Sequence, residues 1–521
     1  MEILTREDLL NLRFFAIKFH SRIARNTYEI IRTTFRDELQ LLTTHRLHRR
    51  LCLLSGITPR IHDCCVNSCC AYLGEYKDQE QCPWCNEPRF GHDGLARKTY
   101  VTYSLEAQLK EWFHYPQSRD LVMYRAGLLK EPDPITIRDV HDGLHAQEVR
   151  AQHIYLDGIP LPHIPFSDDR DLHITISTDG FQTFKRAHHG SFSCWPIIGI
   201  NQNLPPEIRI HIENLIPLGL MPGPSQPKDM DSFLVPLHDD AWRLARGIEA
   251  YDCETNSKFK LHAYVLTASA DMQAAKHLSG MKGPNALSPC RICKLRGVYY
   301  AERRRYYYPL DTPHDKPSPA HRPATYNPRN LPMRSDNDLP EILRKIDLAP
   351  TLGEKEQIAK ENGIVKRSIF TKFPCGSWTK GYPHEYMHLV FENIVPMLIA
   401  LWKGDFREVD HSSQGYVIPE ATWKVIGQEG VESIKTIHSG FCRALPNIYT
   451  HQTLFIAEAY AFWFLHLAPI LLKHRFPSPV YYKNAMKLIK IINTCIKYEL
   501  TWSEVDDLET EIINWVVEFE K

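Results

Sequence analysis

The stretch between residues 172 and 271 constrains the fold most strongly, because its apolar residues follow a two-residue period in several separate runs. LHITIST alternates like a half-buried strand and ends directly at Asp179-Gly180. Helical spacing of apolar residues predicts one helix over 229–249. The runs that predict strands are 172–178, 191–201, 207–216 and 258–271. The predicted order is therefore β-β-β-α-β.

Two aspartates follow the first and the fourth of these strands. Asp179 ends the first strand and Asp271 ends the fourth. This order is that of a ribonuclease H-like core, in which neighbouring central strands bring two distant carboxylates together. We therefore expect an α/β fold with a ribonuclease H-like catalytic core over residues 166–400. Each acid also has a plainer interpretation, since Asp-Gly is a common turn and Asp271 precedes a helix that it would cap.

A cysteine pattern near the N-terminus indicates a metal-organised module. The opening sequence has acidic residues where a secretory signal would be basic and then apolar, so we expect an intracellular chain with reduced cysteines. Four thiolates can close around Zn²⁺, and a module this small lacks an adequate apolar core. The spacing C-x3-C-x12-C-x2-C is formed by Cys65, Cys69, Cys82 and Cys85. We predict an N-terminal zinc ribbon over 62–92, with Cys64, Cys70 and His62 as alternative ligands.

A second cysteine pair predicts a further metal site. Cys290 and Cys293 are two residues apart and need two more ligands from elsewhere. His384 and His388 stand four apart, which places both imidazoles on one face of a helix. A Cys2His2 site that joins an insertion to a later helix would use all four. The alternative is that the histidines are structural and the cysteine pair is a loop feature.

A third acid is expected on the helix that begins near His384. Glu392 is a candidate, although it could equally lie on a solvated face. Two aspartates at strand ends and a glutamate from a packed helix form the kind of set that binds two Mg²⁺ ions. Such ions activate water or a 3′-hydroxyl and stabilise the leaving oxygen. The sequence shows no Walker A, GxSxG or dinucleotide fingerprint.

The remaining segments complete the predicted organisation. Lys+Arg and Asp+Glu are both 62, so any binding to nucleic acid must come from local patches. Candidate patches are the arginines of residues 1–61 and the run Arg303 to Arg305, for which a solvated surface is the ordinary alternative. The apolar stretch 454–472 is interrupted by charged and proline residues, which favours a buried helix over a membrane span. The other predicted segments are a basic helical segment at 1–61, a helical connector at 93–165, a CxxC and Pro-rich insertion at about 281–370, and a helical C-terminal region at 401–521.

Several stretches resemble one family of transposases. STDGFQTFKRAHHGSFSCWPIIGINQNLPPEIR is similar to the catalytic-domain opening of CACTA-type (En/Spm-like) transposases, which runs SDGF, a Ser-rich WP segment and NLPP. The resemblance continues through PGPSQPKDMDSFLVPL, PCRIC and YPHEYMH, and covers roughly residues 60–480. CVNSC and CPWC are similar to the zinc-ribbon segment of the fungal branch.

The resemblance implies a DDE/D transposase that cuts element ends and joins the freed 3′-hydroxyl to target DNA, in the nucleus, with Mg²⁺ or Mn²⁺. By position, Asp179 and Asp271 match the first two acids. For the third, Glu392 ranks first and Glu385 second, because Glu385 stands where the family carries an Asp. Cys290 and Cys293 match the family's CxxC, with His384 and His388 as co-ligands by analogy with related recombinases.

The resemblance also sets the expected partners and the alternatives. The partners are double-stranded DNA at element ends and target; a homo-oligomer is compatible with the resemblance and a membrane is not expected. A catalytically silent, domesticated or decayed relative that binds DNA or protein is the main rival, and a nuclease without strand transfer is a third reading. CACTA-type proteins are usually longer, so a truncated copy or an incomplete gene model is a further alternative. Without a separate helix-turn-helix or zinc-finger array in the sequence, specific DNA recognition would need the basic N-terminal helices, the zinc ribbon or a missing segment.

Overall fold

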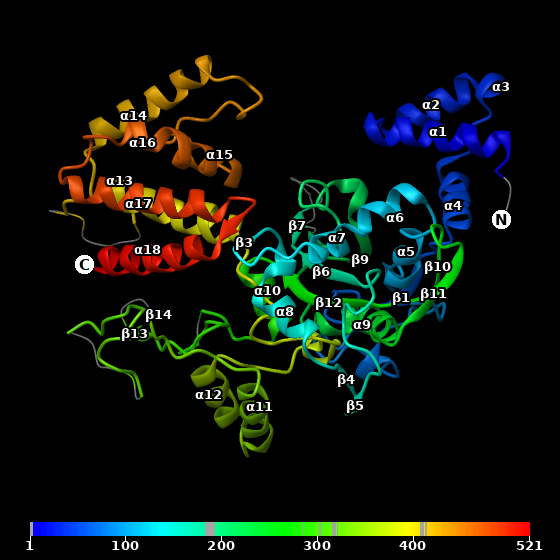
Figure 1. Cartoon of the computed structure of the whole chain (residues 1–521), viewed down its shortest axis with the longest axis horizontal. Helices are drawn as coiled ribbons and strands as arrows, with labels where there is room; N and C mark the ends of the chain where they lie inside the picture. Colours follow the sequence, from blue (N-terminus) through cyan, green and yellow to red (C-terminus); the bar gives the residue numbers. More distant parts are fainter. Residues whose placement is uncertain are drawn as a thin grey trace.

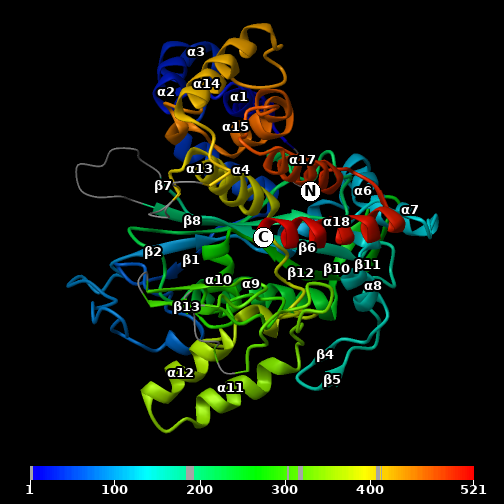
Figure 2. The ribbon, with the colours of Figure 1, turned by 90° about the vertical axis from the view of Figure 1, so that its left-hand side faces the viewer.

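The computed structural model describes residues 4–521 except 183–192, 285, 302–303, 315–318, 320, 407–410 and 412–413. It is a mixed α/β structure with a central sheet and many helices (Figure 1). The N-terminal and C-terminal helices stand above the sheet, while the helices of the insertion lie below it (Figures 1 and 2). In Figure 1 the two groups of terminal helices lie on opposite sides of the core.

The central sheet has the order β1-β2-β9-β8-β6-β12, and β7 pairs with β8. β6, β8 and β9 are antiparallel neighbours, whereas β12 runs parallel to β6 and is reached through the crossover helix α9 (Asp231–Arg246). β6 is buried on both faces, although the alternation of its apolar residues predicted a strand with only one buried face. The strands are β1 (Arg60–Asp63), β2 (Thr99–Thr102), β6 (Leu172–Thr178), β7 (Phe181–Gln182), β8 (Ser193–Asn201), β9 (Ile216–Met221) and β12 (Ala263–Ser269).

The predicted β-β-β-α-β order is present, but the prediction for the third strand is wrong. Residues 207–211 form turns that lead into the short 3₁₀ helix η3 (Ile212–Asn214), and the strand begins only at Ile216. The buried Arg209 side chain donates to the carbonyl of Leu204 and pairs with Asp139, which fixes this stretch as a turn. Ile210 and Ile212 are therefore exposed, whereas Ile208 packs partly buried against the main core.

The predicted fourth strand is divided in two. β11 (Ser257–Leu261) forms a separate hairpin with β10 (Ile248–Asp252), and only β12 enters the central sheet. The break falls at His262, whose ring contacts the buried Asp171. The second predicted strand is described from Ser193 onward, since residues 191 and 192 lie outside the described part.

The zinc-ribbon segment joins the sheet more closely than a separate domain would. β1 and β2 pair with each other on either side of the cysteine segment, and β2 then pairs with β9. Between β2 and the core strands lie α5 (Leu105–Glu111), α6 (Pro116–Val122), α7 (Tyr124–Lys130), β3 (Thr136–Ile137), α8 (Leu144–Arg150), β4 (Tyr155–Leu156) and β5 (Ile159–Pro160).

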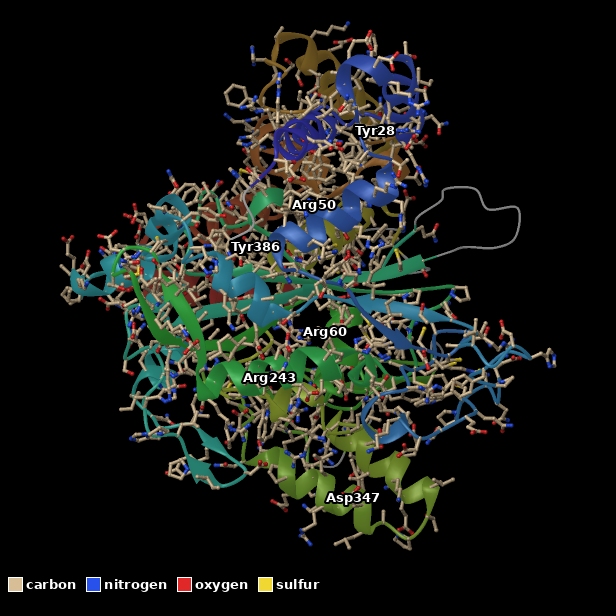
Figure 3. The ribbon with its side chains drawn as sticks, turned by 90° about the vertical axis from the view of Figure 1, so that its right-hand side faces the viewer. Tyr28, Arg50, Arg60, Arg243, Asp347 and Tyr386 are labelled. Atoms are coloured by element: carbon tan, nitrogen blue, oxygen red, sulfur yellow. The ribbon has the colours of Figure 1, made fainter. Side chains whose placement is uncertain are left out.

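The N-terminal helices form a small unit with its own apolar core. The core centres on Tyr28, Leu41 and Leu47. Figure 3 shows Tyr28 among the upper helices and Arg50 on the helix below them. The helices are α1 (Arg6–His20), α2 (Arg25–Thr34), α3 (Arg36–Leu39) and α4 (Thr44–Ser55).

The insertion and the C-terminal region account for the rest. The insertion contains two helices that the sequence analysis did not single out. A second large core holds the C-terminal helices together, and within the described residues no helix is both long and apolar enough to cross a membrane. The elements are α10 (Met272–Ser279), β13 (Val298–Tyr300), β14 (Arg305–Tyr307), α11 (Asp338–Leu348), α12 (Leu352–Asn362), the π-helical η6 (Met387–Ile394), α13 (Val395–Lys403), α14 (Glu420–Ser433), α15 (Ala457–Phe462), the π-helical η9 (Trp463–Leu467), α16 (Ala468–Leu471), α17 (Pro479–Cys495), β15 (Leu500–Thr501) and α18 (Trp502–Glu520).

Candidate active site and metal centre

Asp179 and Asp271 occupy equivalent positions at one edge of the sheet. Ser177 of β6 pairs with Ser269 of β12 in the parallel ladder, and each aspartate lies two residues beyond its serine. Adjacent strands lie about 4.8 Å apart, so the two acids leave the sheet side by side. Asp179 is exposed and Asp271 is half-buried. The topology thus brings together two carboxylates that are far apart in the sequence.

Asp179 lies in an interruption of a continuing strand, and not in a tight turn. Thr178 pairs with Ile197 and Phe181 pairs with Cys194, so the register is the same on both sides of Asp179-Gly180. Gly180 is required there because a Cβ atom would lie 2.3 Å from Nε1 of Trp195. The DGF and WP stretches of the sequence therefore meet at the Asp179 position.

Asp271 also caps the helix that follows it. Its Oδ1 accepts a hydrogen bond from the backbone N–H of Ala274 at 2.6 Å, so the prediction that Asp271 caps this helix is confirmed. No hydrogen bond is recorded in the described part of the chain for its other oxygen, Oδ2. Capping orients the carboxylate and leaves one oxygen for a ligand.

The third group of acids comes from the π-helical segment η6. His388 lies between Glu385 and Glu392: its Nδ1 is 2.5 Å from Glu385 and its Nε2 is 3.6 Å from Glu392. Burial acts to lower the pKa of His388, but the hydrogen bond and charge of Glu385, then the charges of Glu392 and Asp179, raise it above its ordinary value. π-helical segments are rare and often occur at functional sites.

Glu385 and Glu392 have different surroundings. Glu385 accepts hydrogen bonds from the backbone N–H groups of Met387 and His388, in addition to the His388 ring. Its two oxygens therefore cap the start of η6. The Glu392 side chain is 44% exposed, and its recorded contact within the described residues is the longer one to His388. Glu392 is thus the acid with oxygens free to bind a ligand.

The four cysteines predicted as zinc ligands converge. The Sγ atoms of Cys65, Cys69, Cys82 and Cys85 all lie within 4.8 Å of one another, and three of the four residues are buried. Tetrahedral Zn–S bonds of about 2.3 Å would place sulfurs about 3.8 Å apart, which this cluster can meet with small adjustments. A metal such as zinc fits this donor set.

The alternative ligands lie outside this group of four. Cys64 packs in the main core, and His62 contacts the Thr102 hydroxyl at 2.9 Å. Cys70 is fully buried against the cluster, but its backbone carbonyl accepts from Cys65 N–H and so forms the turn of the knuckle. The four cysteines that converge are therefore the four that the spacing predicted as ligands.

A network that the sequence analysis missed ties the ribbon to the core. The carbonyl of Cys69 accepts from the backbone N–H groups of Lys228 and Asp229. Lys366, from the far end of the insertion, forms ion pairs with Asp229 and Asp231. The only sequence signal was the pair of acids in KDMD, which did not reveal a lysine 135 or more positions away as their partner.

The structure brings part of the second predicted metal site together. Cys290 Sγ accepts from the N–H groups of Ile292 and Cys293 at 3.4 Å each. The hydrogen bond from the Cys293 thiol and these backbone donors lower the pKa of Cys290 to about 5. Both cysteines and His384 line one cavity of about 410 Å³, and Arg291 donates to His384 Nδ1.

His388 is not part of that arrangement, because both of its ring nitrogens face the acids Glu385 and Glu392. Among the described residues, only the four-cysteine cluster brings three or more potential ligand atoms within 4.8 Å of each other.

The basic N-terminal segment presents one acid-free helical face. α4 contains no Asp or Glu, and its exposed side includes His45, Arg46, His48 and Arg49. Polar contacts fix α4 against its neighbours: Arg50 pairs with Asp8 of α1, and Thr44 donates to Glu29 of α2. In the insertion, Arg304 and Arg305 are exposed, while Arg303 lies outside the described residues.

The comparison with known protein families gives a match for the central part of the chain. Residues 161–307 match the family model described as transposase family tnp2. This segment is similar to tnp2 transposases. It contains Asp179, Asp271 and the Cys290–Cys293 pair, but it begins after the four-cysteine cluster and ends before Glu385. A search of curated proteins found no match to the chain. The prediction of a transposase family is therefore supported, while the CACTA-type branch stays a prediction.

Proposed function

We propose that this protein is a DDE/D transposase of the CACTA type, which cleaves DNA at element ends and transfers the freed 3′-hydroxyl to target DNA. The observation that carries the proposal is the placement of Asp179 and Asp271 two residues beyond a paired position on adjacent parallel strands. The strand order β9-β8-β6-β12, with β12 parallel to β6, is consistent with a ribonuclease H-like core. The tnp2 match covers this pair.

The donor set fits a hard divalent cation. Carboxylate oxygens are the ligands that Mg²⁺ and Mn²⁺ prefer, and here they are offered by exposed or partly exposed side chains. Asp179, Asp271 and Glu392 would hold the ions. When bound, a pair of such ions polarises the attacking oxygen and stabilises the leaving oxygen of the phosphodiester.

The neighbouring residues set the shape of this site. Ala274 N–H holds one oxygen of Asp271, and Gly180 gives Trp195 the space to pack beside Asp179. His388 binds Glu385 and stands next to Glu392, so we assign Glu392 as the third acid and Glu385 as a positioning residue. Zn²⁺ on the four cysteines is proposed as structural, because the ribbon is anchored through Cys69 to the loop before α9.

Duplex DNA would contact the N-terminal unit through α4. Arg46 and Arg49 are exposed on a helix without acids, and neither has an ion-pair partner among the described residues. Neutralised phosphates release counterions, so binding should weaken steeply with salt. Changing both arginines to alanine should lower the slope of log K against log salt by about 2. Action on chromosomal DNA implies a nuclear location.

The test of the proposal is cleavage and strand transfer on labelled duplex DNA with Mg²⁺ or Mn²⁺. Asp179→Asn and Asp271→Asn remove the charge, and asparagine at 271 still caps α10. Asp347→Asn is the matched control, since Asp347 is exposed on α11, below the central sheet (Figure 3). Product from the native chain and the control, but from neither site variant, would support the proposal.

Binding without cleavage by the native zinc-loaded protein would instead favour a catalytically silent relative. Cleavage without joining would favour a nuclease.

A further inference from the structure

The hairpin β13–β14 of the insertion combines tyrosines and arginines on an exposed two-stranded ribbon. Its pairs are Val298 with Tyr307, Tyr299 with Tyr306, and Tyr300 with Arg305. Residues directly opposite each other share a face, so Tyr299 and Tyr306 lie on one face and Tyr307 and Arg305 on the other. Figure 1 shows this hairpin away from the central sheet, beneath the C-terminal helices.

The tyrosine rings are not all used for internal packing. The ring of Tyr306 is covered by Lys360 of α12, with Nζ 5.5 Å from its centre, and it packs at a tilt against the ring of Tyr299, with the ring centres 5.1 Å apart. Tyr299 nevertheless remains 43% exposed, and Tyr307 on the other face is 48% exposed. Packing across the hairpin explains the position of the Tyr306 ring, but it leaves the rings of Tyr299 and Tyr307 in contact with solvent.

Positive charge accompanies these rings. Arg304 and Arg305 are exposed, and in the described part of the chain neither forms an ion pair. Tyr308 anchors the base of the hairpin, since its hydroxyl donates to the carbonyls of Pro284 and Ala286 at 2.8 Å each. The rings and the guanidinium groups are therefore presented on a fixed base.

The base of the hairpin shares a cavity with residues that are sequence neighbours of the proposed acids. The cavity of about 410 Å³ is lined by Tyr308, by Met272 directly after Asp271, and by His384 directly before Glu385. A strand held at Asp271 would therefore reach the hairpin along this cavity.

We propose that the β13–β14 hairpin binds unpaired nucleotides of a DNA strand next to the acid site, by stacking bases on Tyr299 and Tyr307 and pairing phosphates with Arg304 and Arg305. This inference rests on the proposed function for the identity of the strand. In a duplex, each base is stacked between its neighbours, so the exposed tyrosine rings can stack only on bases of an unpaired strand. Arginines without such rings would bind the phosphates of single-stranded and duplex DNA alike. Aromatic platforms with a basic surround bind single strands in a sequence-tolerant way.

The test measures binding of the full zinc-loaded chain, in buffer without Mg²⁺, to an oligodeoxythymidine of about 20 nucleotides and to a relaxed closed-circular duplex. Tyr299→Ala and Tyr307→Ala should each weaken binding to the single strand about fivefold or more, and should leave duplex binding nearly unchanged. Tyr307→Phe should bind like the native chain. Tyr498→Ala, on a still more exposed tyrosine outside the insertion, is the control.

The arginines give an independent readout. Arg304→Ala with Arg305→Ala should reduce the salt slope for the single strand by about 1.4, while Arg344→Ala on α11 should not. Equal losses on both DNA forms, or single-strand affinities equal to those of the controls, would overturn the proposal.

Photo-crosslinking of the native chain to a bromouracil-containing strand tests the same contact without any variant, so its result does not depend on whether the variants keep the hairpin folded. Adducts are expected at Tyr299 or Tyr307, and adducts found only outside residues 298–308 would also overturn it. None of these measurements requires cleavage, so failure of the proposed catalytic function would leave their outcome readable.

Discussion

Replacement of Gly180 by alanine tests whether Trp195 and Asp179 are packed as one unit. A Cβ atom at this position would lie 2.3 Å from Nε1 of Trp195, 2.9 Å from Cε2 and 3.0 Å from Cδ1. Ordinary contacts begin near 3.4 Å, so the indole would have to move by roughly 1 Å. Trp195 is 7% exposed and belongs to the main core, which leaves it little room.

Overpacking of this kind costs about 1–3 kcal/mol. We therefore expect the free energy of unfolding, measured by urea denaturation, to fall by that amount. The rate of DNA cleavage should fall by more than the loss of folded protein explains, because the backbone displaced at Gly180 also carries Asp179. Gly127→Ala is the control: this glycine lies in α7 with nothing within 4 Å of the added atom, and alanine there should stabilise the helix by about 0.5–1 kcal/mol.

A double change separates packing from other effects. Trp195→Phe provides a smaller ring, so Gly180→Ala should cost less in that background than in the native chain. If Gly180→Ala proved as stable and as active as Gly127→Ala, the packing argument would be refuted.

Further predictions concern the cysteine cluster, the buried histidines and the two glutamates. Cys82→Ser should lower the bound zinc by about one equivalent and reduce the melting temperature, whereas Cys52→Ser, outside the cluster, should change neither; atomic absorption and calorimetry decide this. Burial lowers the pKa of His141 to about 4 and that of His173 well below its ordinary value, so the unfolded chain binds more protons below pH 6.5 and stability is lost as the pH falls. At pH 5 the loss from His141 alone is about 2 kcal/mol relative to pH 7.5, and equal urea midpoints at the two pH values would contradict the assignment. Glu392→Gln should abolish cleavage at nearly native stability. Glu385→Gln should lower the free energy of unfolding and retain part of the activity, because it removes the negative charge that binds the His388 ring. The reverse pattern would exchange the roles of the two glutamates.

The sequence was most informative where the signal is local. Cys65, Cys69, Cys82 and Cys85 lie within 21 residues, and short knuckles aim their sulfurs at one point whatever the rest of the chain does. Alternation in LHITIST and the acid at its end predicted β6 and the position of Asp179 for the same reason. The predicted element order placed the strands that end at Asp179 and Asp271 next to each other, and the structure adds that β12 runs parallel to β6.

Long-range contacts could not be predicted in this way. The spacing of His384 and His388 predicts a shared helical face, but His384 lies before the first helical residue, Tyr386. The spacing also gives no sign that His388 binds Glu385 and lies next to Glu392. The alternation in EIRIHIENLI looks like a strand, although buried Arg209 binds Asp139, seventy residues earlier, and holds the stretch as a turn.

The central claim is that Asp179 and Asp271 bind catalytic metal ions, and a change of ligand chemistry tests it most directly. Thiolate sulfur binds Mg²⁺ poorly and softer Mn²⁺ better. Asp179→Cys and Asp271→Cys should therefore lose DNA cleavage in Mg²⁺ and regain a measurable part of it in Mn²⁺, while Asp347→Cys behaves like the native chain in both. Native-level cleavage by either site variant in Mg²⁺ would contradict the claim.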